Sequence, residues 1–132
     1  MNRMLSVVFV VLCMTSGCSH TPRQELTKDD LFRQKILGSW SEGTSPYSIA
    51  TFIQGGGYKA VMYSTVEKRE VVLAAEGVWW IKDGFLYNKA DKINPPKLPL
   101  DKVYVDKIVD ISKDTMTLID ETGQQYTKRK LP

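Results

Sequence analysis

The chain has 132 residues, a net charge of +3 and a single histidine. This length suits about one domain. Its 18 Lys and Arg nearly balance its 15 Asp and Glu, so the strongly basic surface typical of nucleic-acid-binding proteins is not expected.

The first 17 residues have the features of a bacterial secretory signal. One arginine precedes an apolar run over residues 5–14, which is too short to cross a bilayer as a helix. The small residues Ser16 and Gly17 then precede Cys18. We therefore predict a signal peptide over residues 1–17.

The residues around Cys18 resemble the lipobox of bacterial lipoproteins, in which a small residue precedes a cysteine that is acylated on sulfur. Thr15 stands where that pattern usually has leucine, and ordinary signal cleavage near Ser19 is the alternative. The resemblance implies that palmitate or a similar lipid on Cys18 anchors the protein in the bacterial cell envelope. Because Ser19 rather than aspartate follows, it implies the outer membrane, with the protein facing the periplasm. Residues 18–26 would then form a tether before a domain over residues 27–132.

A short helix is predicted over residues 28–37. Thr27 suits the N-cap, and Asp30 three residues later completes a capping box. Phe32 and Ile36 lie one turn apart and would share an apolar face. A glycine follows the helix, as is common at helix C-termini.

Beyond this helix the hydrophobic pattern becomes strand-like. Tight turns such as Asp83-Gly84 separate short runs rich in β-branched and aromatic residues, and three prolines place a loop over residues 91–100. Sequential hairpins favour an all-β fold, a small antiparallel up-and-down β-barrel preceded by the one short helix. The predicted strands are 39–41, 47–53, 58–66, 71–81, 85–89, 103–111, 116–119 and 124–129.

Several of these residues resemble a known family. Gly38-Ser39-Trp40, after a short helix and opening the first strand, is similar to the G-x-W signature of lipocalins. Gly77-Val78-Trp79 before Asp83-Gly84 resembles the hairpins of bacterial lipocalin-like (calycin-type) domains. The resemblance spans residues 31–130. It implies a ligand-binding barrel closed at one end by Trp40, with Arg129 stacked across the indole.

The large aromatic residues are the candidates for the barrel interior. Trp79 and Trp80 are neighbours in a strand, so they must face opposite sides of the sheet. The resemblance points Trp79 inward, and Trp80 would lie outside, either beneath the helix or free to contact a partner or a membrane. Such residues could line a cavity or fill it. The cavity-lining candidates are Phe52, Tyr58, Met62, Trp79 and Tyr126.

The sequence offers no catalytic or metal-binding set, and we predict neither enzyme activity nor a cofactor. His20 falls in the tether, and Cys18 would be acylated. Asp106 and Asp110 are assigned to the exposed face of one strand, and Asp120 to a solvated turn.

Two functions from different classes remain. The leading hypothesis is a membrane-anchored lipoprotein that binds a small apolar or amphipathic molecule, with a cavity that opens opposite Trp40. The alternative is a protein-binding envelope lipoprotein, such as an assembly accessory, an inhibitor or an immunity protein. This alternative predicts a filled barrel and a partner surface that includes Trp80.

Overall fold

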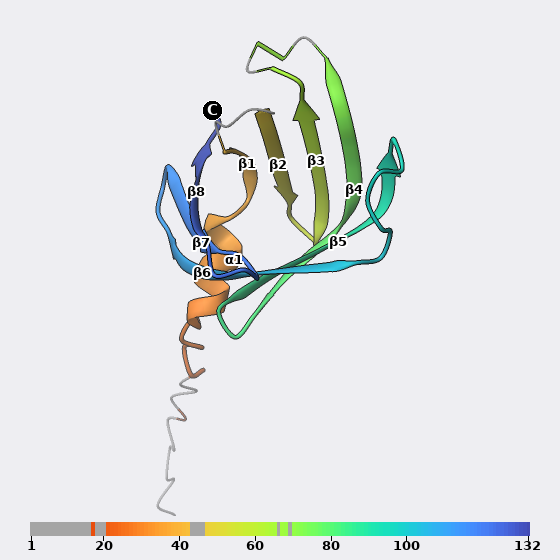
Figure 1. Ribbon diagram of the computed structural model, residues 1–132. Helices are drawn as coiled ribbons and strands as arrows, with labels where there is room; N and C mark the ends of the chain where they lie inside the picture. Colours follow the sequence, from red (N-terminus) through yellow and green to blue (C-terminus); the bar gives the residue numbers. More distant parts are fainter. Residues whose placement is uncertain (1–16, 18–20, 43–46, 66, 69) are drawn as a thin grey trace, which may run out of the picture.

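The computed structural model describes residues 17, 21–42, 47–65, 67–68 and 70–132, which form one helix and eight strands. The strands pair antiparallel in chain order, and the last meets the first to close a barrel (Figure 1). The predicted all-β up-and-down barrel is thereby confirmed. The elements are α1 (Lys28–Lys35), β1 (Gly38–Ser41), β2 (Tyr47–Ile53), β3 (Gly57–Tyr63), β4 (Val71–Lys82), β5 (Phe85–Asn94), β6 (Val103–Ile111), β7 (Thr115–Ile119) and β8 (Gln125–Lys130).

Helix α1 starts with the predicted capping box. The Thr27 hydroxyl accepts a hydrogen bond from the Asp30 amide at 3.1 Å, and the Asp30 carboxylate accepts one from the Thr27 amide at 3.0 Å. The helix ends two residues before the predicted position, with Ile36 as its C-cap. Gly38, at a φ of +114°, then turns the chain directly into β1.

Helix α1 covers one end of the barrel, which we call the closed end (Figure 1). Phe32 and Ile36 are buried there against Trp40, whose indole nitrogen donates to the Ile36 carbonyl at 2.7 Å. The Asp29 carboxylate accepts hydrogen bonds from the amides of the β4–β5 turn, and Arg33 donates to the Ile81 carbonyl at 2.6 Å. These contacts fix the helix across the barrel base.

Three register shifts interrupt the strand pairing, including one between Met62 and Tyr63 in β3. Another lies between Glu76 and Gly77, where a side chain at Gly77 would overlap the Lys89 carbonyl oxygen. The glycine in this strand thus permits a close backbone approach. The third lies between Ile108 and Asp110 in β6.

Strand β5 continues five residues beyond its predicted end at residue 89. Ala74, Ala75 and Glu76 of β4 pair with its last residues, so the ladder extends to Asn94. Pro95 follows, and its missing N–H ends the pairing. The predicted loop over residues 91–100 is correspondingly shorter, because β4 is long enough to hold these polar residues in the sheet.

The hydrophobic core fills the closed half of the barrel. Within it Phe52 packs edge-on against Trp79, with ring centroids 5.8 Å apart. The buried cluster comprises Phe32, Ile36, Trp40, Ala50, Phe52, Trp79, Ile81, Leu86, Ile108, Ile111, Met116 and Leu118.

Candidate functional site

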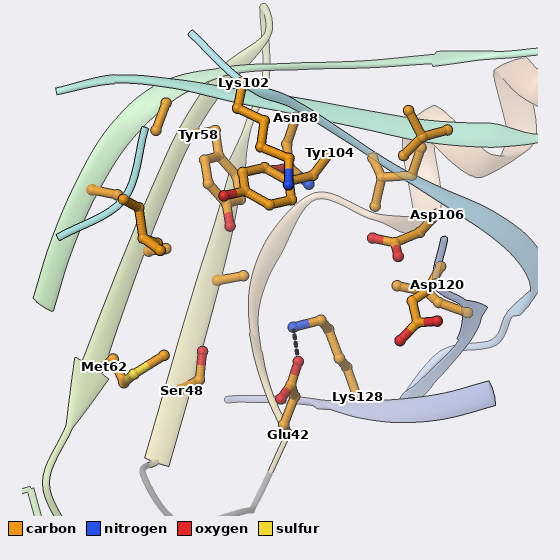
Figure 2. A pocket seen from close by; sticks show the side chains of 18 of the residues that line it. Glu42, Ser48, Tyr58, Met62, Asn88, Lys102, Tyr104, Asp106, Asp120 and Lys128 are labelled. Atoms are coloured by element: carbon orange, nitrogen blue, oxygen red, sulfur yellow. Dashed lines mark hydrogen bonds and ion pairs between the residues drawn. The ribbon is translucent and has the colours of Figure 1, made fainter. Parts of the chain in front are cut away.

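The other half of the barrel is hollow. A cavity of about 420 Å³ adjoins the core, and neither Trp40 nor any residue of α1 lines it. Figure 2 shows side chains of its lining. This volume falls within the range of about 300–1,000 Å³ that is typical of small-molecule sites. The cavity is lined by Glu42, Ser48, Ala50, Phe52, Tyr58, Ala60, Met62, Leu73, Ala75, Leu86, Asn88, Ala90, Ile93, Leu98, Lys102, Tyr104, Val105, Asp106, Leu118, Asp120, Glu121, Thr122, Tyr126 and Lys128.

The cavity floor is apolar. Phe52, Leu86 and Leu118 belong both to the buried core and to the cavity lining, so the core forms the floor. Four alanines, including Ala60 and Ala75, occupy inward positions on β2 to β5. Their small side chains leave open the space that larger residues would fill.

The cavity wall also contains a partly buried ion pair. Lys128 of β8 lies 3.0 Å from a carboxylate oxygen of Glu42, and its side chain is only 9% exposed (Figure 2). Its ammonium group also lies 5.7 Å from the centre of the Tyr126 ring. The charge of this lysine is therefore compensated within the barrel.

Asp106 of β6 points into the cavity and forms no salt bridge within the described part of the chain. Burial raises the pKa of its carboxyl group, while the nearby Tyr126 hydroxyl and Lys128 ammonium lower it. Burial likewise raises the pKa of Tyr58 to about 12, with the Asp106 charge as the next cause. Desolvation and Asp106 raise the pKa of Tyr126 as well.

Asp120 adds a carboxylate at the cavity mouth, besides that of Asp106 on the wall. Its Oδ1 accepts hydrogen bonds from the amides of Thr122 at 2.9 Å and Gln124 at 3.0 Å, in the turn between β7 and β8. Its bond with the Thr122 hydroxyl and these amide bonds lower the pKa of Asp120. A fixed negative charge therefore stands at this rim.

Four of the five cavity-lining candidates, Phe52, Tyr58, Met62 and Tyr126, do line this cavity. Trp79 does not. It points inward, as predicted, but its indole nitrogen donates to the Ile53 carbonyl at 2.9 Å and its ring lies against Phe52, outside the cavity lining. Its place near the β2–β3 turn puts it nearer the closed end.

The predicted stacking of Arg129 across Trp40 is wrong. Trp40 is fully buried at the closed end, but the cation over its ring is Lys130, 5.2 Å from the centroid. Successive strand residues alternate between faces, so Lys130 shares the inward face with Lys128 while Arg129 is exposed. The prediction therefore named the residue one position before the lysine that lies over Trp40.

Trp80 lies on the outer wall and is 38% exposed. Its ring stacks on Tyr87 of the neighbouring strand, with centroids 5.3 Å apart and planes 4° from parallel. Trp80 borders a hollow that is also lined by Arg33, Gln34 and Leu37. The helix therefore reaches the edge of this indole without covering it.

The polar half of the cavity was missed from the sequence. Asp106 and Asp110 were assigned to one exposed face, but the β6 bulge adds Val109 between them. Asp106 therefore faces inward while Asp110 is exposed. Lys128 could have been found, because it lies two residues from Tyr126 and must share its face.

The described residues contain no helix long and apolar enough to span a membrane. They also contain no group of three or more His, Cys, Asp or Glu side chains placed to hold a metal ion. Cys18 and His20 lie outside the described residues.

The closed eight-stranded antiparallel barrel, with a helix before its first strand, defines a lipocalin-like fold. A solved structure of similar fold is that of a lipocalin-like protein from Bacteroides uniformis, which has a TM-score of 0.54 and 20% sequence identity. The match covers 74% of this chain and 99% of that protein. Neither a protein-family profile nor a curated protein sequence matches the chain.

Proposed function

We propose that this protein binds a small amphipathic molecule inside its barrel and has no catalytic role. The observation that carries the proposal is the cavity of about 420 Å³, with an apolar floor and polar groups toward its mouth. Small-molecule sites combine these same features, since apolar walls supply affinity and a few polar groups orient the ligand. The lipocalin-like fold agrees with such a use.

A cavity-filling variant tests this function. Ala75 lines the cavity, whereas Ala74, its neighbour in β4, lies on the opposite face of the strand. We expect native mass spectrometry of the protein, isolated from a bacterial envelope, to show a bound small molecule. Ala75→Phe should lose this bound mass, and the matched control Ala74→Phe should keep it. A bound mass that survives Ala75→Phe, or none in the unchanged protein, would refute the proposal.

We also propose that lipid on Cys18 holds the protein at the outer membrane. The signal-like leader and the lipobox resemblance support this location. Helix α1 follows the proposed tether directly, so the closed end would lie nearest the lipid and the cavity mouth farther from it. We expect the protein to fractionate with membranes and to carry an acyl mass, and Cys18→Ser to lose both.

The outer wall offers a second candidate function, a contact surface for an envelope protein. The stacked and exposed Trp80–Tyr87 pair favours it. A photo-crosslinking residue at position 80 should then capture one defined protein in cells, whereas the same residue at the exposed position of Asp110 should not. Equal capture at both positions would eliminate this function.

A further inference from the structure

The charges that line the cavity differ in sign from those of the whole chain. The chain has a net charge of +3. The cavity lining, in contrast, contains the carboxylates of Glu42, Asp106, Asp120 and Glu121 and only two lysines. An anionic ligand would therefore meet an excess of negative charge.

Neither lysine places an uncompensated positive charge deep in the cavity. Lys128 is paired with Glu42 at 3.0 Å inside the barrel. Lys102 lies at the exposed rim, where its ammonium group stands 4.8 Å from the centre of the Tyr104 ring. The lysine inside the barrel is thus compensated by a carboxylate, and the other stands at the rim.

Asp106 is in the opposite situation. Its carboxylate is partly buried and forms no salt bridge among the described residues. Tyr126 and Lys128 only partly offset the burial of this carboxylate, and Lys128 is already paired with Glu42, so an arriving cation would lower the remaining cost of its charge. The cavity therefore offers a better site for a positive charge than for a negative one.

Tyr58 supplies a second polar group on the cavity wall. Its side chain is half-buried and carries a hydroxyl group at the lining. Figure 2 shows this hydroxyl directed into the cavity. A phenol oxygen can accept a hydrogen bond, and an ammonium group donates three.

We propose that the ligand is an amphipathic amine, whose ammonium group pairs with Asp106 and donates to Tyr58 while its apolar part lies on Phe52, Leu86 and Leu118. This inference rests on the proposed function, because it names the chemical class of the molecule that the barrel binds. Asp120 at the mouth adds a second negative charge that attracts a cation toward the cavity.

Octylamine, octanol and octanoate test the proposal, because they share one alkyl chain and differ only in their polar end. Binding to the full chain is followed by NMR through the Met62 methyl group, which lines the cavity. The Met116 methyl group, fully buried in the core, serves as the internal reference. Met62→Leu and Met116→Leu assign the two signals.

We expect octylamine to bind about tenfold or more tightly than octanol, and octanoate to bind most weakly. Asp106→Asn should abolish the preference for octylamine over octanol. The matched control Asp110→Asn, on the exposed face of the same strand, should bind all three probes like the unchanged protein.

The outcomes separate this inference from the proposed function. Octanol or octanoate binding as tightly as octylamine would overturn the amine assignment and leave a small-molecule site standing. An amine preference that persists in Asp106→Asn would overturn the role of Asp106. No shift of the Met62 methyl signal with any probe would overturn both proposals.

Discussion

Asp106 carries a carboxylate inside the barrel, on the wall that β6 contributes. Its pKa is raised because the surrounding protein replaces water, and Lys128 and Tyr126 only partly offset this effect. Lys128 is already paired with Glu42, so it does not act as a full counter-ion. The charged form of Asp106 therefore works against folding when the cavity is empty.

This effect predicts a pH-dependent gain in stability for Asp106→Asn. Because the pKa of Asp106 is higher in the folded than in the unfolded protein, stability falls as pH rises from the unfolded value of about 3.9 through the folded one. The variant should melt at a higher temperature than the parent at pH 7, and the difference should vanish below pH ~3.9. Thermal unfolding between pH 3 and 8 measures this. A variant that is less stable at pH 7, while Asp110→Asn is neutral, would contradict it.

Lys130 and Arg129 are neighbouring cations on opposite faces of β8. Lys130→Met should lower the free energy of unfolding by about 0.5–1 kcal/mol, because it removes the cation over Trp40. Arg129→Met removes an exposed charge and should change stability by less than about 0.5 kcal/mol. Urea denaturation measures the stability of both variants. A larger loss for Arg129→Met than for Lys130→Met would instead support a contact between Arg129 and Trp40.

At the scale of elements, helix α1 is held by the β4–β5 turn as well as by its own apolar face. Both oxygens of the Asp29 carboxylate accept backbone amides of that turn, from Asp83 at 2.8 Å and from Gly84 at 2.9 Å. A charged acceptor strengthens such bonds. The turn and the helix therefore stabilise each other at the closed end.

Asp29→Ala should lower the free energy of unfolding by about 1–2 kcal/mol, because two amides lose a charged acceptor. Amide hydrogen exchange should become faster at Asp83 and Gly84. Glu25→Ala, an exposed acidic residue before the helix, is the control and should change neither quantity. Unchanged exchange at the turn would show that the helix does not depend on this contact.

The register shift between β4 and β5 has its own test at Gly77. A Cβ at this position would overlap the backbone of Lys89, so Gly77→Ala should cost about 3 kcal/mol or more. Gly57→Ala places a Cβ at an ordinary 3.4 Å from Ile53 and should cost less than about 1 kcal/mol. Equal unfolding midpoints for the two variants would contradict the close approach.

Some of these elements could be predicted from sequence because their signals are local. The Thr27 capping box and the Asp83-Gly84 turn each depend on residues within one turn of chain. The β6 bulge at Val109 has no such signal, since valine fits a regular strand equally well. That one inserted residue decides which aspartate enters the barrel, so the site's charge could not be predicted although its aromatic lining largely was.

The two ends of the barrel differ in packing. The closed end combines α1, Trp40 and the buried cluster, and it supplies most of the apolar burial that holds the fold. The opposite end keeps a cavity at some cost to packing. This division agrees with the proposed binding of a small molecule in the cavity.

Intermolecular NOEs between octanol and the full chain test this division most directly, because they locate a neutral amphipathic molecule regardless of its charge preference. The predicted result is contacts from the alkyl chain to the Met62 methyl group and to the rings of Phe52 and Tyr58, with none to the Met116 methyl group. Contacts confined to the outer wall at Trp80 and Tyr87, or none anywhere on the barrel, would contradict a ligand-binding cavity.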